Sequence, residues 1–399
     1  MILWCNQYSK SLNRYRIVDR NFLSSPYIHC NKLTQAMKRI TRIIILALAA
    51  LSFGSCISVD DLNPMNTPNP STGIPSSTTA NCYIVSNSGS YSFPTVKGGS
   101  TESVGDVVSA EVLWESFGTD VRPSVGDLIG SVSYSNGEIS YTVSSPFKEG
   151  NAVIAAKDAY GEILWSWHIW LTDQPEEQVY YNNAGTMMDR NLGATSATPG
   201  DVGALGLLYQ WGRKDPFLGS SSINSDAKAK STGSWPLPVA LSSSMGTVDY
   251  ATKNPMTFID ASSSGVGWLY SSRNDALWQS AKTIYDPCPA GWRVPDGGFE
   301  DGVWYRACGF SDYLESLYDD VDKGVNFSGV FGSASVIWYP GPGQINSLSL
   351  SFVGEYSFYW SVTPFDEHML GLDLRNDYCD TRGAEFRCYL GNPVRCLKE

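Results

Sequence analysis

Residues 163–171 combine three tryptophans with a hydrophobic residue at every second position, which is the pattern of a β-strand with a buried face. One face of this strand carries Ile163, Trp165, Trp167, Ile169 and Leu171. The opposite face carries Leu164, Ser166, His168 and Trp170. That face is too apolar to be turned toward water, so the pattern predicts a strand covered on both sides, the second side by a later part of the chain. In such a strand His168 is expected to be structural rather than catalytic.

Short apolar runs separated by turn residues extend this β pattern over residues 81–177. The clearest turn is Asn136-Gly137, which lies between alternating apolar residues on either side. Asn and Gly readily take the positive φ angles that a two-residue hairpin turn requires. Because the runs recur at intervals of about ten residues, residues 81–177 are predicted to form an immunoglobulin-like β-sandwich.

A polar, proline-containing stretch at residues 172–177 marks the expected boundary to a second domain, residues 178–399. This second part is rich in Gly, Ser, Trp and Tyr, and short helices are expected near residues 202–211 and 304–308, with long ordered loops between them. The expected fold class is therefore mainly β with minor α, a β-sandwich followed by an α+β domain.

Residues 37–55 have the parts of a bacterial signal peptide: a basic start, a short apolar run and small residues before Cys56. The apolar run is about eleven residues long, whereas a spanning helix needs roughly 20, so a cleaved signal is expected rather than a permanent anchor. The sequence before Cys56 resembles a lipobox, with Phe53 where Leu is commoner. Cys56 is thus expected to carry lipid and to anchor the protein to the outer membrane, facing the exterior.

Residues 1–36 and 56–80 flank this signal. Residues 1–36 precede a good signal peptide and indicate a mis-assigned start codon. Residues 56–80 are mostly Pro, Ser, Thr, Asn and Gly, which is typical of a disordered or extended tether. Asp60-Asp61 in this tether resembles the surface-export signal of lipoproteins from the Bacteroides group, and a merely solvated linker explains it equally well.

Charge excludes one class of partner. The whole chain has a formal net charge of −12, and without residues 1–55 it keeps 20 Lys and Arg against 39 Asp and Glu. A strongly acidic protein is repelled by nucleic acid and by anionic lipid headgroups. No nucleic-acid partner is expected, and the membrane is expected to be contacted through the lipid anchor only.

Five motifs occur in a distinctive order in the second part of the chain. They are MDRNLGA at 188–194, LYQWGRKDPF at 208–217, DPCPAGWRVP at 286–295, YWSVTP at 359–364 and PVRCLK at 393–398. Together they resemble the Fibrobacter major paralogous domain of Bacteroidetes surface proteins, over residues 178–399. The resemblance implies a C-type-lectin-like fold whose termini meet on one sheet, and the first domain resembles the β-sandwich that often precedes it.

The resemblance also implies a disulfide between Cys288 and Cys396. The remaining late cysteines, Cys308, Cys379 and Cys388, leave a second bridge open, and Cys82 stands alone in the first domain. Closing a loop of this length stabilises a fold by roughly 4 to 5 kcal/mol in the chain-entropy model.

Catalytic chemistry is poorly supplied. After residue 36 the histidines are His168 and His368, in separate predicted domains, and no nucleophile elbow, HExxH motif or phosphate-binding loop is present. The charged residues of the motifs, Arg190, Arg213, Lys214 and Asp215, are expected to form a buried ion-pair network. A non-enzymatic protein is therefore expected.

An acidic stretch at residues 319–326 is a weak calcium candidate, through Asp320 and Asp322. An EF-hand loop needs Gly at its sixth position and Glu at its twelfth.

 Counted from Asp320, the fifth position holds Gly324 and the twelfth holds Phe331, so the stretch departs from that pattern. The sugar-binding calcium motifs of C-type lectins, Glu-Pro-Asn and Trp-Asn-Asp, are missing as well. A solvated acidic loop is the favoured interpretation, and no cofactor is expected.

Aromatic residues in loops are the remaining candidates for ligand binding. Sugar rings stack on aromatic faces, and the residues that fit are Trp268, Tyr270, Trp338 and Tyr339, each close to Gly or Pro. Packing in the core is the alternative for most of them. The resulting hypothesis is an adhesin-like or glycan-binding surface lipoprotein, and the alternative is an accessory or tip subunit of a fimbria that binds protein partners.

Overall fold

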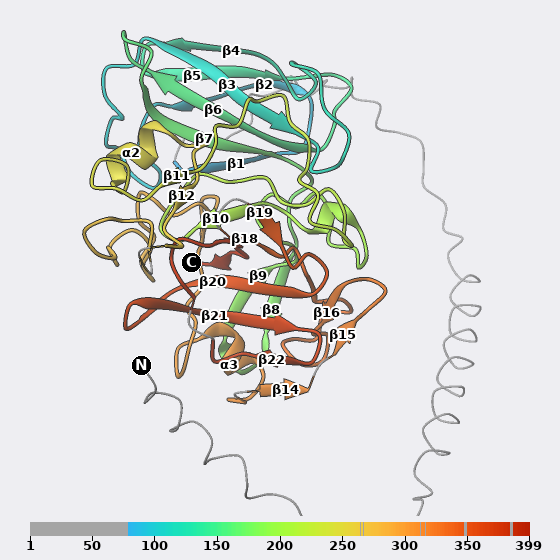
Figure 1. Cartoon of the computed structure of the whole chain (residues 1–399). Coiled ribbons are helices and arrows are strands. Elements are labelled where there is room, and N and C mark those ends of the chain that lie inside the picture. The colour runs from blue at the N-terminus through green and yellow to red at the C-terminus, as the bar shows by residue number, and fades with distance from the viewer. Residues whose placement is uncertain are drawn as a thin grey trace, which may run out of the picture. The chain divides into compact units, whose positions relative to one another are not determined.

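The computed structural model describes residues 79–399, apart from residues 264, 266, 312, 316, 347, 348, 384 and 385. This part of the chain is mostly β, as expected, and its α-helices α2 (Val248–Lys253) and α3 (Val303–Ala307) are short (Figure 1). Neither of these helices has the length or the apolar character needed to cross a bilayer. The predicted signal peptide, Cys56 and nearly all of the predicted tether lie outside the described residues.

Two sheets enclose a hydrophobic core in the first part of the chain (Figure 1). The first sheet has the order β1 (Cys82–Val85), β7 (Ile163–Leu171), β6 (Gly150–Lys157) and β3 (Ser109–Ser116). The second has the order β2 (Gly89–Pro94), β5 (Glu138–Val143) and β4 (Ile129–Ser135). Strand β1 runs parallel to β7, and the other pairs are antiparallel.

The predicted hairpin is confirmed. Strands β4 and β5 pair with Ser135 opposite Glu138, and the two turn residues, Asn136 and Gly137, have φ angles of 51° and 82°. Both angles are positive, which explains why this turn needs Asn and Gly.

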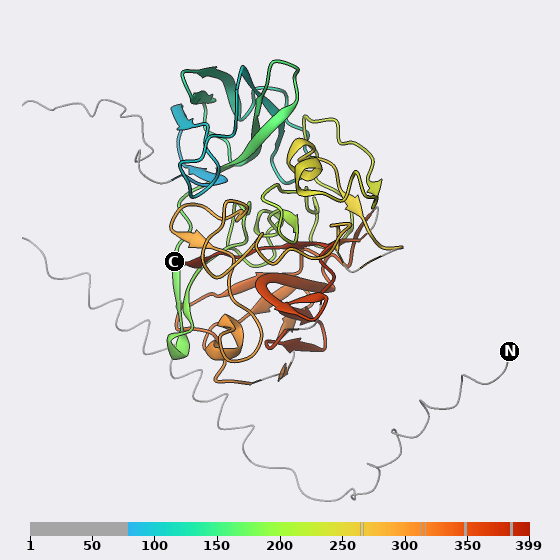
Figure 2. The same ribbon diagram turned by 90° about the vertical axis from the view of Figure 1, so that its left-hand side faces the viewer.

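Strand β7 is buried on both faces, as its sequence predicts. Trp165 and Trp167 point into the core between the two sheets. Trp170, on the other face, belongs to a different hydrophobic cluster that includes Leu192 and Trp211 from the later part of the chain. Helix α2 packs against the same strand (Figure 2).

The part of the chain after β7 forms several small sheets joined by long loops. One sheet joins β13 (Trp292–Arg293), β24 (Leu397–Lys398), β9 (Gly185–Met188) and β8 (Glu177–Tyr180). A second joins β14 (Tyr313–Glu315), β22 (Tyr378–Asp380), β21 (His368–Arg375) and β20 (Tyr356–Phe365). A third joins β10 (Leu208–Gln210), β23 (Gly391–Pro393), β18 (Gln344–Asn346) and β19 (Ser349–Ser351). The rest are β15 (Tyr318–Asp319), β16 (Gly324–Asn326) and β17 (Trp338–Pro340), and the parallel pair β11 (Val239–Ala240) and β12 (Ile259–Asp260).

The first of these sheets brings together strands from both ends of the region. Leu397 of β24 pairs with Met187 of β9, so the last strand of the chain lies beside the second strand after residue 177. Short 3₁₀ turns, η1 (Tyr181–Asn183) and η2 (Val202–Ala204), connect some of the strands.

The helix expected at residues 202–211 is not present, which corrects that prediction. Only η2 is helical there, and residues 208–210 form β10, which pairs with β23. Gly206 has a φ of 75°, which lies in the left-handed region and ends the helical turn. The helix expected near 304–308 is present as α3, while α2 was not anticipated, although Thr247 caps it by accepting a hydrogen bond from the Tyr250 amide at 3.0 Å.

The two predicted domains share one hydrophobic cluster, besides the clusters of their own. The cluster that holds Cys82, Trp114 and Trp170 of the sandwich also holds Trp211 and Cys288 of the later part. The described residues all belong to one compact unit. The polar stretch at 172–177 connects β7 of the first sheet to β8, and the boundary expected there stays a prediction.

Candidate functional site

A buried lysine joins the outer face of β7 to the later part of the chain. The Nζ of Lys214 lies 2.6 Å from a carboxylate oxygen of Asp215 and donates to the hydroxyl of Ser166 at 2.7 Å. That hydroxyl donates to Asp215 at 2.6 Å, and the Lys214 ammonium lies 4.6 Å from the centre of the Trp165 ring. Burial lowers the pKa of Lys214, while Asp215 opposes this shift. All of these groups are satisfied by one another, so the cluster is a structural contact and not a site open to a ligand.

The expected charged network is divided in two. Arg190 pairs with Asp189 at 3.0 Å and with Asp173 at 2.5 Å, away from the Lys214–Asp215 pair. Arg213 belongs to neither pair, because its guanidinium donates to the carbonyl of Thr257 at 2.7 Å and to other carbonyls nearby. Burial lowers the pKa of Arg213 to about 10.

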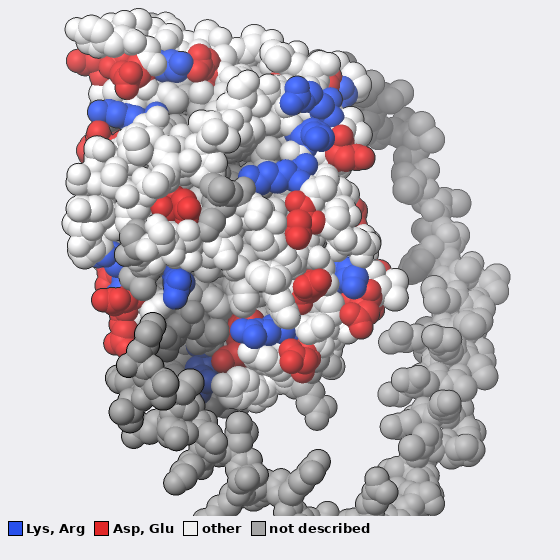
Figure 3. Space-filling model, viewed as in Figure 1, with Lys and Arg blue, Asp and Glu red and all other residues white. Residues whose placement is uncertain are grey.

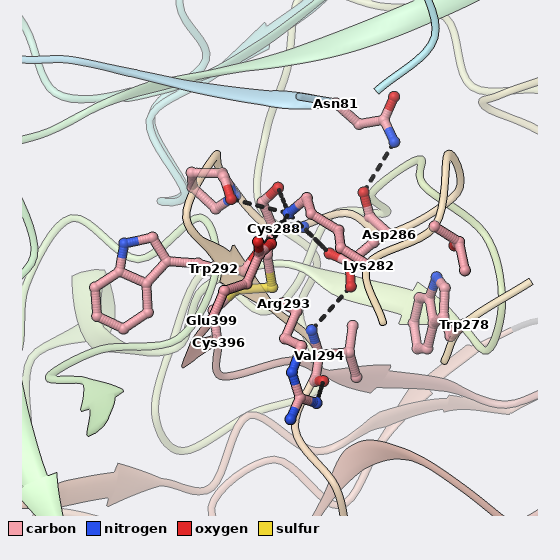
Figure 4. Close-up of polar contacts among 12 residues, drawn as sticks. Asn81, Trp278, Lys282, Asp286, Cys288, Trp292, Arg293, Val294, Cys396 and Glu399 are labelled. Atoms are coloured by element: carbon pink, nitrogen blue, oxygen red, sulfur yellow. Dashed lines mark hydrogen bonds and ion pairs between the residues drawn. A yellow bond between two sulfur atoms is a disulfide. The ribbon is translucent and has the colours of Figure 1, made fainter. Parts of the chain in front are cut away.

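The disulfide implied by the resemblance is present between Cys288 and Cys396. Figure 4 shows the Nζ of Lys282 beside it, where it donates to the carbonyl oxygens of Cys288 at 2.8 Å and Pro289 at 2.9 Å. Asp286 completes this arrangement by accepting from the amides of Cys288 at 2.8 Å and Val294 at 2.9 Å. Lys282 was not singled out from the sequence, and its position four residues before the aspartate of the Asp-Pro-Cys-Pro motif is the only signal that could have found it.

A cleft of about 870 Å³ borders this lysine, between residues 94–101 and residues 280–293. The basic groups that line it already have partners. Lys282 donates to the carbonyls of Cys288 and Pro289, and Arg293 pairs with Asp296 at 2.5 Å. Its lining also includes Glu399, whose carboxylate lies 3.9 Å from Lys282, and it contains no aromatic side chain. This cleft therefore offers little to hold a ligand.

The side chains of Cys82 and His168 are hydrogen-bonded to each other, with Sγ 3.3 Å from Nδ1. Both side chains are buried, and burial raises the pKa of the Cys82 thiol and lowers the pKa of His168 to about 3. An external substrate cannot reach this pair in the conformation described. Burial also raises the pKa of the Cys388 thiol to about 12. Cys308, Cys379 and Cys388 form no disulfide in the described part of the chain.

Three of the four aromatic residues expected to bind a ligand belong to the core, which corrects that prediction. Trp268 is 2% exposed and donates its ring N–H to the carbonyl of Trp211 at 2.7 Å. Trp338 and Tyr339 are buried in β17, and the Tyr339 hydroxyl lies 2.9 Å from the hydroxyl of Tyr180. These rings are covered because they fill the space between sheets, so they have no free face for a sugar.

Tyr270 differs from the other three, since it is 59% exposed. It borders a hollow of about 490 Å³ between residues 265–273 and the turn that joins β20 to β21. The backbone fixes the position of Tyr270, whose amide donates to the carbonyl of Gly246 at 2.9 Å. Two residues earlier, the buried Trp268 anchors the same loop.

Arg273 connects the loop that carries Tyr270 to the turn between β20 and β21. Its guanidinium bonds to both carboxylate oxygens of Asp275 and donates to the carbonyl of His368 at 2.9 Å and to that of Asp366. The bond with Asp275 raises the pKa of Arg273. Asp366 and Glu367, both exposed, line the hollow as well. The lining of the hollow thus combines one exposed tyrosine with serine, arginine and acidic residues, and the guanidinium of Arg273 is held in place by its bonds.

The acidic stretch has a local structural role. Asp319 accepts hydrogen bonds from the amides of Val321 at 2.8 Å and Asp322 at 3.0 Å, which closes the turn between β15 and β16. Asp320 is exposed, with Lys323 3.9 Å away. Among the residues that the structure describes, no three His, Cys, Asp or Glu side chains are grouped as a metal site would need. Acidic and basic side chains are scattered over the face seen in Figure 3, where most of the surface is uncharged.

Comparison with known proteins does not assign a family. No family model matches the chain, and no match was found among the curated proteins or the solved structures. The resemblance rests on the sequence motifs, and the function has to be argued from the hollow beside Tyr270.

Proposed function

We propose that this chain is a non-enzymatic surface lipoprotein that binds a glycan in the hollow beside Tyr270. The observation that carries the proposal is the exposed ring of Tyr270 at the edge of a concave, polar site. The apolar face of a sugar ring stacks on such a ring, while neighbouring polar groups bond to its hydroxyls. An exposed aromatic residue at a hollow is thus better suited to a sugar than to a small ion.

The polar groups around Tyr270 support the same proposal. Arg273 is held in place by Asp275 and two carbonyls, so little side-chain entropy remains to be lost when it donates to a hydroxyl. Asp366 and Glu367 supply acceptors, and Ser271 and Ser272 supply groups that both donate and accept. Sugar hydroxyls need both kinds of partner.

The remaining parts of the proposal follow from the sequence. Export by residues 37–55 and lipid at Cys56 would place the protein at the outer membrane, facing outward. The region after residue 177 would be a Fibrobacter major paralogous domain of C-type-lectin-like fold, and the immunoglobulin-like β-sandwich would act as its spacer. Calcium is not part of this proposal.

A glycan array tests the proposal directly. The purified protein, with Cys56→Ser to remove the lipid acceptor, is screened with and without calcium beside Tyr270→Ala. Loss of a stacking ring removes about 0.5 to 1.5 kcal/mol, so we expect binding to weaken by roughly two- to tenfold in Tyr270→Ala. Tyr160→Ala is the matched control, because Tyr160 is 91% exposed but lies in the turn after β6.

Two results would contradict the proposal. One is silence across a broad array by a correctly folded protein, which would favour the alternative of a fimbrial accessory subunit with protein partners. The other is equal weakening by Tyr270→Ala and Tyr160→Ala, which would mean that binding does not involve the hollow.

A further inference from the structure

A second hollow, of about 370 Å³, lies next to the first one. Phe299 lines it and is 52% exposed, so this hollow also has an aromatic ring turned toward solvent. Buried Trp278 contributes to its lining, together with the carboxylates of Asp296 and Asp301. Neither Phe299 nor these carboxylates stood out in the sequence.

The loop that carries Phe299 is fixed against β20. The amide of Gly297 donates to the hydroxyl of Thr363 at 3.0 Å, and the amide of Val362 donates to the carbonyl of Pro295 at 2.9 Å. At the far end of the loop, the amide of Val303 donates to the carbonyl of Asp296 at 3.0 Å. These bonds hold the second hollow in place before any ligand arrives.

The two hollows share a wall. Arg273 lines the first hollow and Asp275 lines the second, and these two side chains bond to each other. On strand β20 and the turn after it, Pro364 lines the second hollow and Asp366 the first. Phe365, which lies between them in the chain, is 41% exposed. Exposed ring surface is therefore present in the linings of both hollows, from Tyr270 and Phe299.

The lining of the two hollows is acidic. Its carboxylates come from Asp275, Asp296, Asp301, Asp366 and Glu367, of which Asp296 is paired with Arg293 at 2.5 Å. Arg273 is the one basic residue in the two linings, and its charge is matched by Asp275. Arg382 lies 5.3 Å from the ring of Phe299 and pairs with Asp380 at 3.7 Å. Anionic sugars would be repelled by this lining, whereas neutral and amino sugars would not.

We propose that the two hollows are subsites of one groove that binds an oligosaccharide of neutral or amino sugars. Tyr270 stacks on one sugar ring and Phe299 on another, and the shared Arg273–Asp275 wall lies under the linkage between them. This inference rests on the proposed function, because it extends the same site along the chain of its ligand.

Calorimetric titration with glucosamine oligomers tests the inference, with a dimer and a hexamer as probes. We expect the hexamer to bind at least about tenfold more tightly than the dimer, because it reaches both rings. Tyr270→Ala is expected to weaken both probes, and Phe299→Ala only the hexamer. An oligogalacturonate of the hexamer's length should bind about tenfold more weakly than the glucosamine hexamer, since its carboxylates meet an acidic lining.

The outcomes separate this inference from the proposed function. If the two probes bind equally well, or if Phe299→Ala leaves the hexamer unaffected while Tyr270→Ala weakens it, the second subsite is wrong and the first stands. Preferential binding of oligogalacturonate would overturn the choice of sugar. If no oligosaccharide binds to the folded protein, both proposals fail. Tyr160→Ala again serves as the control for an exposed ring elsewhere.

Discussion

His168 is buried, and its two hydrogen-bond partners fit the neutral form of the imidazole. Its Nε2 lies 2.8 Å from the side-chain oxygen of Asn151, and the amide nitrogen of Asn151 donates to the carbonyl of Gly193 at 2.9 Å. The asparagine oxygen must therefore accept, so Nε2 carries the proton. Nδ1 is then free to accept the thiol hydrogen of Cys82 at 3.3 Å. A second ring proton would leave the thiol facing a donor.

This arrangement makes stability depend on pH. Burial lowers the pKa of His168 from 6.5 to about 3 in the folded protein, while the unfolded chain takes up a proton below pH 6.5. The contribution of His168 is thus intact above pH 6.5 and is lost as the pH falls toward 3. We expect a loss of about 1.4 kcal/mol in the free energy of unfolding for each pH unit between about pH 6 and pH 4.

Urea unfolding at a series of pH values measures this loss. In His168→Gln the dependence of the free energy of unfolding on pH should fall by about 1.4 kcal/mol per pH unit, which corresponds to one proton. His368→Gln, which removes a histidine outside the buried pair, is the control for the general effect of acid on carboxylates. An unchanged slope in His168→Gln would show that the folded protein takes up this proton in the same pH range as the unfolded chain, so that burial does not hold His168 neutral.

Strand β7 depends on a buried ion pair on its outer face. Asp215→Ala leaves the Lys214 ammonium buried with only the Ser166 hydroxyl and carbonyl as partners. Removing one member of a buried pair costs about 3 to 5 kcal/mol, so we expect a loss of that order in the free energy of unfolding. The double variant Lys214→Met, Asp215→Ala should recover part of the loss, since no charge is left buried.

An exposed pair is the matched control for this element. Lys398 lies 2.6 Å from Glu177, and both side chains are about half exposed. Such pairs contribute about 0 to 1 kcal/mol, so Glu177→Ala should change stability little. Equal losses in Asp215→Ala and Glu177→Ala, measured by chemical denaturation, would contradict a special role for the buried pair.

Elements whose pattern is local could be predicted from the sequence, and elements set by distant partners could not. The Asn136-Gly137 turn and the two apolar faces of β7 are encoded in a few adjacent residues. In contrast, residues 208–210 become a strand only because residues 391–393 pair with them. The residues of the site could not be predicted for the same reason. Trp268 and Tyr270 are both aromatic and lie two residues apart, but only Trp268 is buried, by its contact with Trp211. Lys282 and Phe299 carry no pattern that separates them from ordinary loop residues.

At the scale of the whole molecule, the shared core should make the described part of the chain unfold as one unit. The cluster around Trp170 and Trp211 is built from both predicted domains, and Asn81 donates to the carbonyls of Ile284 and Asp286 at 2.8 Å. Separating the two parts would expose the outer face of β7 with its buried polar groups. Neither part would keep its own contacts unchanged.

The disulfide provides the test of this cooperativity, because it lies in the later part while its effect should reach the sandwich. Cys288 and Cys396 are 108 residues apart, and in the chain-entropy model the paired variant Cys288→Ser, Cys396→Ser loses about 4 to 5 kcal/mol. We expect calorimetry to give one transition in the parent protein and one, at a lower temperature, in the variant. Hydrogen exchange at the amides of β5, remote from the disulfide, should accelerate together with that of β24. If the exchange of β5 stayed at the parental rate while that of β24 rose, the sandwich would be stable by itself, and the boundary expected at residues 172–177 would divide two independent folding units.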